Sequence, residues 1–155
     1  MRISNAHMLT HDIDWFCCLD SQYLCHFASN GSILPEFVAD YRVLRTIQQL
    51  VAALPAFFSE EEVLIDEDYK RELQELEGYD EQRYFKSFKL FASKGFYSFD
   101  YDYLHNEEGR YRYITGPSHP LDPRIIEEIL NAGLPNIIIR EDNGMYEELV
   151  HQINR

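Results

Sequence analysis

The sequence has few basic residues and no long apolar run. Only 14 of its 155 residues are lysine or arginine, against 27 aspartates and glutamates, and the formal net charge is −13. Such a chain repels phosphate groups, so we expect it to bind neither nucleic acid nor a membrane surface. No stretch approaches the roughly 18 consecutive apolar residues that a membrane-spanning helix requires. The excess of negative charge favours a basic protein as the partner.

Cysteine is also scarce. Cys17, Cys18 and Cys25 are an odd number within nine positions, which is a poor disulfide framework and indicates reduced thiols. The N-terminus has no apolar segment typical of a secretory signal, so we expect a cytoplasmic protein. A thiolate or zinc site with His26 would need converging ligands, but neighbouring cysteines on a strand point to opposite faces. We therefore expect three core cysteines, no metal and no cofactor.

The residues that are present predict one folded domain over residues 1–155. Hydrophobic residues make up 45% of the chain and aromatic residues 14%, which is enough for one core. Alternating aromatic runs predict two hairpins, and apolar residues at three- and four-residue steps predict helices. We expect an α+β fold with an antiparallel sheet, built from two hairpins plus a further strand and covered by helices. The expected strands are 13–19, 23–28, 97–103, 110–115 and 135–140, and the expected helices are 37–54, 59–78, 84–94, 123–130 and 145–153.

Each hairpin has a predicted register. In the first, Leu19 pairs with Tyr23, so that Cys17 lies opposite Cys25 and Trp15 opposite Phe27. In the second, Leu104 lies opposite Arg110, so that aromatic residues pair on one face and ion pairs form on the other. The pairs expected from this second register are Tyr103 with Tyr111, Tyr101 with Tyr113, and Asp102 with Arg112.

Residues 59–82 carry an unusual density of acid: eleven aspartates and glutamates against Lys70 and Arg71. Ser59 and Glu62 match a capping box, so the segment is expected to be mostly helical, with a short strand at 63–65 as the alternative. A run of charge is commonly a solvated helix face, but mutual repulsion at this density costs stability unless a basic partner uses the field. The predicted contact residues are Glu60, Glu61, Glu62, Asp66, Glu67 and Asp68, with Tyr69 and Tyr79 as aromatic anchors.

A different site is conceivable at the second hairpin. Asp100, Asp102, His105 and Arg112 could form a pocket in which two carboxylates act as acid and base. However, the arginines on the neighbouring strand are expected to keep both aspartates ionised, which favours a surface ion-pair ladder.

The remaining histidines give weaker signals. His7 and His11 have the spacing of two metal ligands on a helix, but the local sequence supplies no third ligand, which favours a polar N-terminal arm. His119 lies in a proline-rich segment and is expected to be a solvent-facing loop residue.

Two parts of the chain resemble a kind of small uncharacterised bacterial protein. The first part runs from Asp14-Trp15-Phe16 through the segment 26–31 to Leu34-Pro35, and the second is the segment 91–100. Together they cover about a third of the chain. Some such proteins are similar to immunity partners of bacterial toxins, which are commonly small, acidic and without catalytic residues.

The leading hypothesis is therefore a non-enzymatic bacterial interaction protein, of the immunity type, that binds a basic partner through its acidic surface. The alternative is a small enzyme or ligand-binding domain with its site near the second hairpin. A subunit of a homo-oligomer is the third possibility, and the oligomeric state is open.

Overall fold

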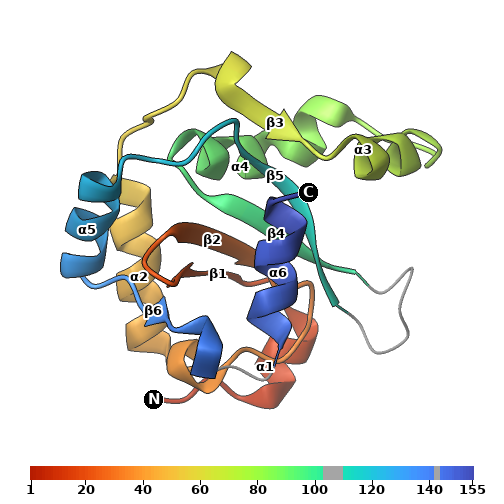
Figure 1. Ribbon diagram of the computed structural model, residues 1–155. Helices are drawn as coiled ribbons and strands as arrows, with labels where there is room; N and C mark the ends of the chain where they lie inside the picture. Colours follow the sequence, from red (N-terminus) through yellow and green to blue (C-terminus); the bar gives the residue numbers. More distant parts are fainter. Residues whose placement is uncertain (103–109, 142–143) are drawn as a thin grey trace.

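The computed structural model describes residues 1–102, 110–141 and 144–155, which form an α+β fold (Figure 1). The helices in this part of the chain are α1 (Asn5–Thr10), α2 (Tyr41–Ala53), α3 (Glu67–Gln74), α4 (Glu81–Ser93), α5 (Pro123–Asn131) and α6 (Met145–Ile153). The strands are β1 (Asp14–Leu19), β2 (Tyr23–Ala28), β3 (Val63–Ile65), β4 (Tyr97–Asp102), β5 (Arg110–Pro117) and β6 (Asn136–Ile137). The short 3-10 helices are η1 (Glu36–Val38), η2 (Glu60–Glu62) and η3 (Ile139–Glu141). None of the described helices is both long enough and apolar enough to pass through a lipid bilayer.

The sheet is mixed, and the prediction of a purely antiparallel sheet was wrong. The strands lie in the order β3-β5-β4-β2-β1-β6. The pairs β1–β2, β4–β5 and β3–β5 are antiparallel, whereas β2–β4 and β1–β6 are parallel. Alternation along a strand reveals its faces but not the direction of its neighbour. The long connection between β2 and β4, which contains three helices, allows these two strands to run in the same direction.

The predicted register of the first hairpin is confirmed. Leu19 pairs with Tyr23, and Cys17 lies opposite Cys25. The turn places Asp20 and Ser21 at φ of 50° and 56°, and the Gln22 amide donates to the Leu19 carbonyl. Two consecutive residues with positive φ are the mark of a tight hairpin turn whose twist suits the strands.

The second hairpin pairs two residues away from the predicted register. Tyr101 lies opposite Tyr111, and Asp102 lies opposite Arg110 rather than Arg112. A shift of two keeps every side chain on its predicted face, because faces alternate with a period of two. The predicted partners Tyr103 and Leu104 lie outside the described residues.

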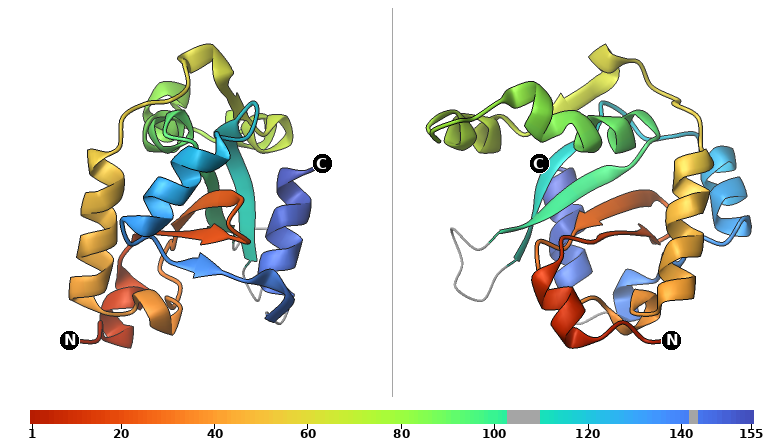
Figure 2. Two further views of the ribbon diagram at one scale, coloured as in Figure 1. Left: turned by 60° about the vertical axis from the view of Figure 1, so that its left-hand side comes forward. Right: turned by 180° about the vertical axis from the view of Figure 1, so that it is seen from behind.

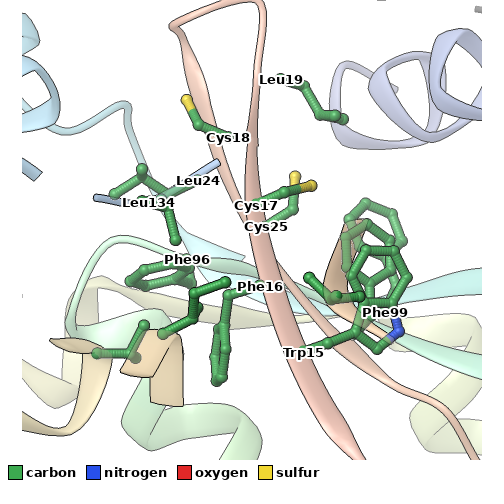
Figure 3. Packing of buried hydrophobic residues seen from close by; sticks show 14 of the residues in the cluster. Trp15, Phe16, Cys17, Cys18, Leu19, Leu24, Cys25, Phe96, Phe99 and Leu134 are labelled. Atoms are coloured by element: carbon green, nitrogen blue, oxygen red, sulfur yellow. The ribbon is translucent and has the colours of Figure 1, made fainter. Parts of the chain in front are cut away.

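The sheet buries hydrophobic side chains on both of its faces (Figure 3). Trp15, Cys17 and Cys25 lie on one face, where the Trp15 ring stacks on Phe27 at 4.0 Å between ring centroids. Phe16 and Cys18 lie on the other. All three cysteines are free and buried, as predicted, and burial raises the pKa of Cys18 to about 12. They therefore act as core residues.

The acidic segment is less helical than expected. It forms η2, then β3 along the edge of the sheet, then α3, so the alternative of a strand at Val63–Ile65 is confirmed. The predicted capping box forms: the Ser59 amide donates to Glu62 Oε1 at 3.0 Å. It caps one 3-10 turn because β3 follows at once.

The structure differs from the predictions in two segments near the chain ends. The expected buried strand over 135–140 contains only the short, partly exposed strand β6, followed by η3. The N-terminal arm contains α1, whose first turn is capped by the Ser4 side chain.

Candidate functional site

A groove of about 1070 Å³ lies between α3, β5 and α6, and we call it the α3–β5–α6 groove. One wall is formed by Asp66, which caps α3, and by Glu67, Asp68 and Glu72 of the helix itself. Residues 110–113 of β5 form the floor, and α6 forms the other wall with Leu149, Gln152 and Ile153 among others. Figures 1 and 2 show α6 on one face of the sheet and α3 beyond the edge strand, toward the side of α4.

The floor of this groove is an open edge of the sheet. β3 covers β5 only from Thr115 to Pro117, and the Asp66 amide adds one bond to the Ile114 carbonyl at 2.7 Å. The chain then leaves the edge, because the Asp66 side chain accepts from the Tyr69 amide and starts α3. No described strand pairs with the outer side of residues 110–113.

A glutamine side chain partly covers this edge. Gln152 Oε1 accepts from the Tyr113 amide at 3.0 Å, and its Nε2 donates to the Tyr111 carbonyl at 3.3 Å. The amide group therefore supplies one acceptor and one donor, as a residue of a neighbouring strand would. α6 brings Gln152 here because Tyr146 and Leu149 bury its apolar face against the sheet.

Arg112 joins the floor to the acidic wall. Its guanidinium donates two hydrogen bonds to Glu72, at 2.6 and 3.1 Å, and lies 3.9 Å from Asp66 and 3.8 Å from Asp102. It also lies 4.7 Å from the centre of the Tyr69 ring. Burial lowers the pKa of Arg112, but the neighbouring carboxylates outweigh it and hold the pKa above its ordinary value. Six carboxylates and three guanidinium groups line the groove in total.

The structure separates the predicted contact residues into two groups. Asp66, Glu67 and Asp68 line the groove, whereas Glu60, Glu61 and Glu62 lie in η2, before β3. Some charged groups of the acidic segment form ion pairs within the molecule. Asp68 pairs with Arg71 at 3.2 Å, and Lys70 pairs with Glu81 at 3.0 Å.

The two predicted anchors do not project their hydroxyl groups into solvent. The Tyr69 hydroxyl lies 2.6 Å from that of Tyr84 and donates to Asp100 at 3.2 Å. The Tyr79 hydroxyl is buried and has no hydrogen-bond partner among the described residues. Both tyrosine rings pack against the hydrophobic cluster that contains Leu73 of α3.

The alternative pocket is divided in a similar way. Asp102 and Arg112 line the α3–β5–α6 groove, whereas Asp100 lies beneath Tyr69 and Tyr84, which both donate to its Oδ2. His105 lies outside the described residues. The structure therefore brings together part of the acidic set and part of the alternative set, which sequence reasoning had kept apart.

The neighbouring arginines do not lower the pKa of Asp100, contrary to the expectation. Burial, together with the charge of Asp12, raises the pKa of Asp100 to about 6, although hydrogen bonds from Tyr69 and Tyr84 lower it. Arg112 does not hold this carboxyl ionised, because its guanidinium is bonded to Glu72. Asp100 is partly exposed, and one of its carboxylate oxygens accepts hydrogen bonds from both tyrosines.

A serine, a histidine and an aspartate also meet between β1, β2 and β4, a cluster that sequence reasoning missed, in which the Asp14 side chain is 48% exposed. His26 contacts Ser98 Oγ through Nδ1 at 2.8 Å and Asp14 Oδ1 through Nε2 at 2.7 Å. A catalytic serine must reach its substrate, but Ser98 is 0% exposed and His26 is 1% exposed. The only signal is the parallel pairing of His26 with Ser98, which requires knowledge of the fold.

The described residues contain no group of three or more histidine, cysteine or acidic side chains arranged to hold a metal ion. His7 and His11 stack their rings at 3.8 Å, and His11 Nδ1 lies 2.9 Å from the His7 carbonyl oxygen. His119 is exposed, with Nε2 3.9 Å from Glu62.

The α3–β5–α6 groove is therefore the site at which charge, an open strand edge and apolar surface meet. Comparisons of the chain with protein-family models, with curated proteins and with solved structures find no match.

Proposed function

We propose that the protein is a non-enzymatic bacterial interaction protein, of the immunity type, that binds a basic protein partner through its acidic surface. The observation that carries this proposal is the α3–β5–α6 groove, where six carboxylates face three guanidinium groups. Glu67 and Asp68 are exposed residues of the groove, and the exposed Glu60 and Glu61 extend the negative field outside it. A field of one sign speeds the association of a partner of opposite sign.

The state of the reactive groups supports a binding role rather than catalysis. Ser98 and His26 are buried in the core, and Asp100 accepts hydrogen bonds from two tyrosines. Burial also raises the pKa of each cysteine thiol. A thiol with a raised pKa is a poor nucleophile, because the thiolate is the reactive form. The net charge of −13 disfavours nucleic acid and anionic lipid as partners, and the free cysteines suit the reducing cytoplasm.

The test uses three pairs of adjacent acids, each reversed to lysine. The variants are Glu60→Lys with Glu61→Lys, Glu67→Lys with Asp68→Lys, and, as a matched control on α5, Glu127→Lys with Glu128→Lys. All six residues are exposed, and each variant changes the net charge by the same amount. The tagged proteins are used to capture partners at low and at high salt, with circular dichroism to check folding.

We expect the first two variants to lose a partner that the wild type retains at low salt, and the control to keep it. Because screening weakens exposed charge pairs, high salt should release the partner from the wild type as well. Equal loss in all three variants would mean that only total charge matters, and unchanged capture in the first two would refute the proposal.

A ligand-binding domain is the second candidate, because the groove brings Asp102 and Arg112 together in a hollow of sufficient volume. A small molecule that raises the melting temperature, and that loses this effect in Asp102→Asn, would favour this reading.

A further inference from the structure

We propose that the open edge of β5, at residues 110–113, accepts an extended segment of the partner as an added strand. The segment we infer alternates apolar residues with lysine or arginine. This inference rests on the proposed function, since it assigns the basic partner a way of binding in the same groove.

The edge has the geometry that strand addition requires. β3 already pairs with β5 at Thr115–Pro117 and stops at Ile65, so an added strand would continue the same line of pairing. Backbone groups of Tyr111 and Tyr113 point outward into the groove, since both are held by Gln152. Proteins protect open strand edges, because these edges pair readily with other chains.

The Gln152 side chain that occupies this edge can easily be replaced by an incoming backbone. Gln152 contributes two hydrogen bonds from a single side chain, and an incoming backbone offers the same donor and acceptor. Exchange of equivalent hydrogen bonds changes the free energy little, so the cover can yield without disturbing the buried side of α6.

The two walls of the groove dictate the alternation. On the side of α6, Leu149 and Ile153 belong to the apolar cluster that packs against Tyr111 and Tyr113. On the side of α3, the carboxylates of Asp66 and Glu72 surround Arg112. Successive side chains of a strand point to opposite faces, so apolar residues would contact α6 and cations would contact the acidic wall.

The charge of the molecule favours a basic partner over a second copy of the chain. Two copies pairing edge to edge would bring two molecules of net charge −13 together, acidic wall beside acidic wall. Like charges across an interface oppose association, whereas lysine or arginine on the incoming strand would reverse the sign.

The experiment measures peptide binding to the full-length protein by fluorescence anisotropy. The probe is a capped seven-residue peptide that alternates lysine and valine. Its controls are the same peptide with glutamate in place of lysine, and the same peptide N-methylated at alternate amides. N-methylation removes backbone donors while leaving side chains and charge unchanged, so it separates strand pairing from simple charge attraction.

We expect the lysine peptide to bind, the glutamate peptide not to bind, and N-methylation on the edge-facing amides to weaken binding at least tenfold. Hydrogen exchange should slow over residues 110–113 when the peptide is added. The Gln152→Ala variant should bind the peptide several-fold more tightly, because the glutamine side chain no longer occupies the β5 edge. The Gln48→Ala variant on α2 serves as a control far from the groove.

Several outcomes would overturn strand addition. These are equal binding of the N-methylated and unmodified peptides, unchanged hydrogen exchange over residues 110–113, and failure of the lysine peptide to bind. None of them decides the proposed function, which is measured separately by partner capture with the paired lysine variants. A dimer that forms through the same edge would slow hydrogen exchange without any peptide, and would refute the basic segment as occupant.

Discussion

Replacing Asp100 with asparagine tests whether the carboxyl beneath Tyr69 and Tyr84 costs stability at neutral pH. In the folded protein its pKa is raised from 3.8 to about 6, first by burial and then by the charge of Asp12. The folded state therefore holds this proton more tightly than the unfolded chain does. The contribution of Asp100 to wild-type stability is most favourable below pH 4, falls as the pH rises from about 4 to about 6, and stays low above that.

The size of the effect follows from the two pKa values. A difference of about two units corresponds to about 3 kcal/mol, at roughly 1.4 kcal/mol for each unit. Asparagine carries no charge at any pH, and its oxygen still accepts a hydrogen bond from a tyrosine. We expect the free energy of unfolding of Asp100→Asn, relative to the wild type, to rise by about 2–3 kcal/mol between pH 4 and pH 7.

Urea unfolding at several pH values between 4 and 8 measures this difference. Trp15 is the single tryptophan and is fully buried, so its fluorescence reports the transition. The control is Glu127→Gln, which removes one exposed acid on α5. A difference between Asp100→Asn and the wild type that is the same at every pH would refute the reasoning, because Asp100 would then titrate alike in both states.

Two further predictions concern the packing of the sheet and of α2. Gly116→Ala should destabilise the fold by about 1–3 kcal/mol in the same urea assay, because the added Cβ would lie 2.5 Å from the Tyr113 hydroxyl and 2.6 Å from the Tyr97 ring; a stability equal to the wild type would show that these rings move aside freely. Lys94→Met should also cost about 1–3 kcal/mol, because the buried Lys94 amine donates to two carbonyls at the end of α2, at 3.0 and 3.2 Å, whereas the exposed control Lys86→Met should cost much less. Equal effects of the two lysine variants would contradict this role.

The features that the sequence predicted best depend on residues that are close together in the chain. The first hairpin follows from a short connection and from alternation, so Leu19 and Tyr23 could be paired correctly. The helix that became α2 follows from the spacing of Leu44, Ile47 and Val51, which are its buried residues. In the second hairpin, the tyrosine-rich faces fit two registers that differ by two residues, and the pattern alone could not choose between them.

Long-range features escaped prediction because they join distant segments. The α3–β5–α6 groove depends on Glu72, Arg112 and Gln152, which come from three elements and have no shared motif. The contact between His26 and Ser98 depends on the parallel pairing of β2 with β4. The raised pKa of Asp100 likewise depends on its burial and on the charge of Asp12, a residue far from it in the sequence.

The helix α3, which carries the acidic wall, is attached to the fold by contacts outside the main hydrophobic core. Leu73 is the buried residue of this helix, and it belongs to the smaller of the two hydrophobic clusters, apart from the main core. The helix is also held by the hydrogen bonds of the Tyr69 hydroxyl with Tyr84 and Asp100, and by the charge pair between Glu72 and Arg112, which dissolved ions weaken. The part of this attachment that depends on charge should therefore weaken as the ionic strength rises.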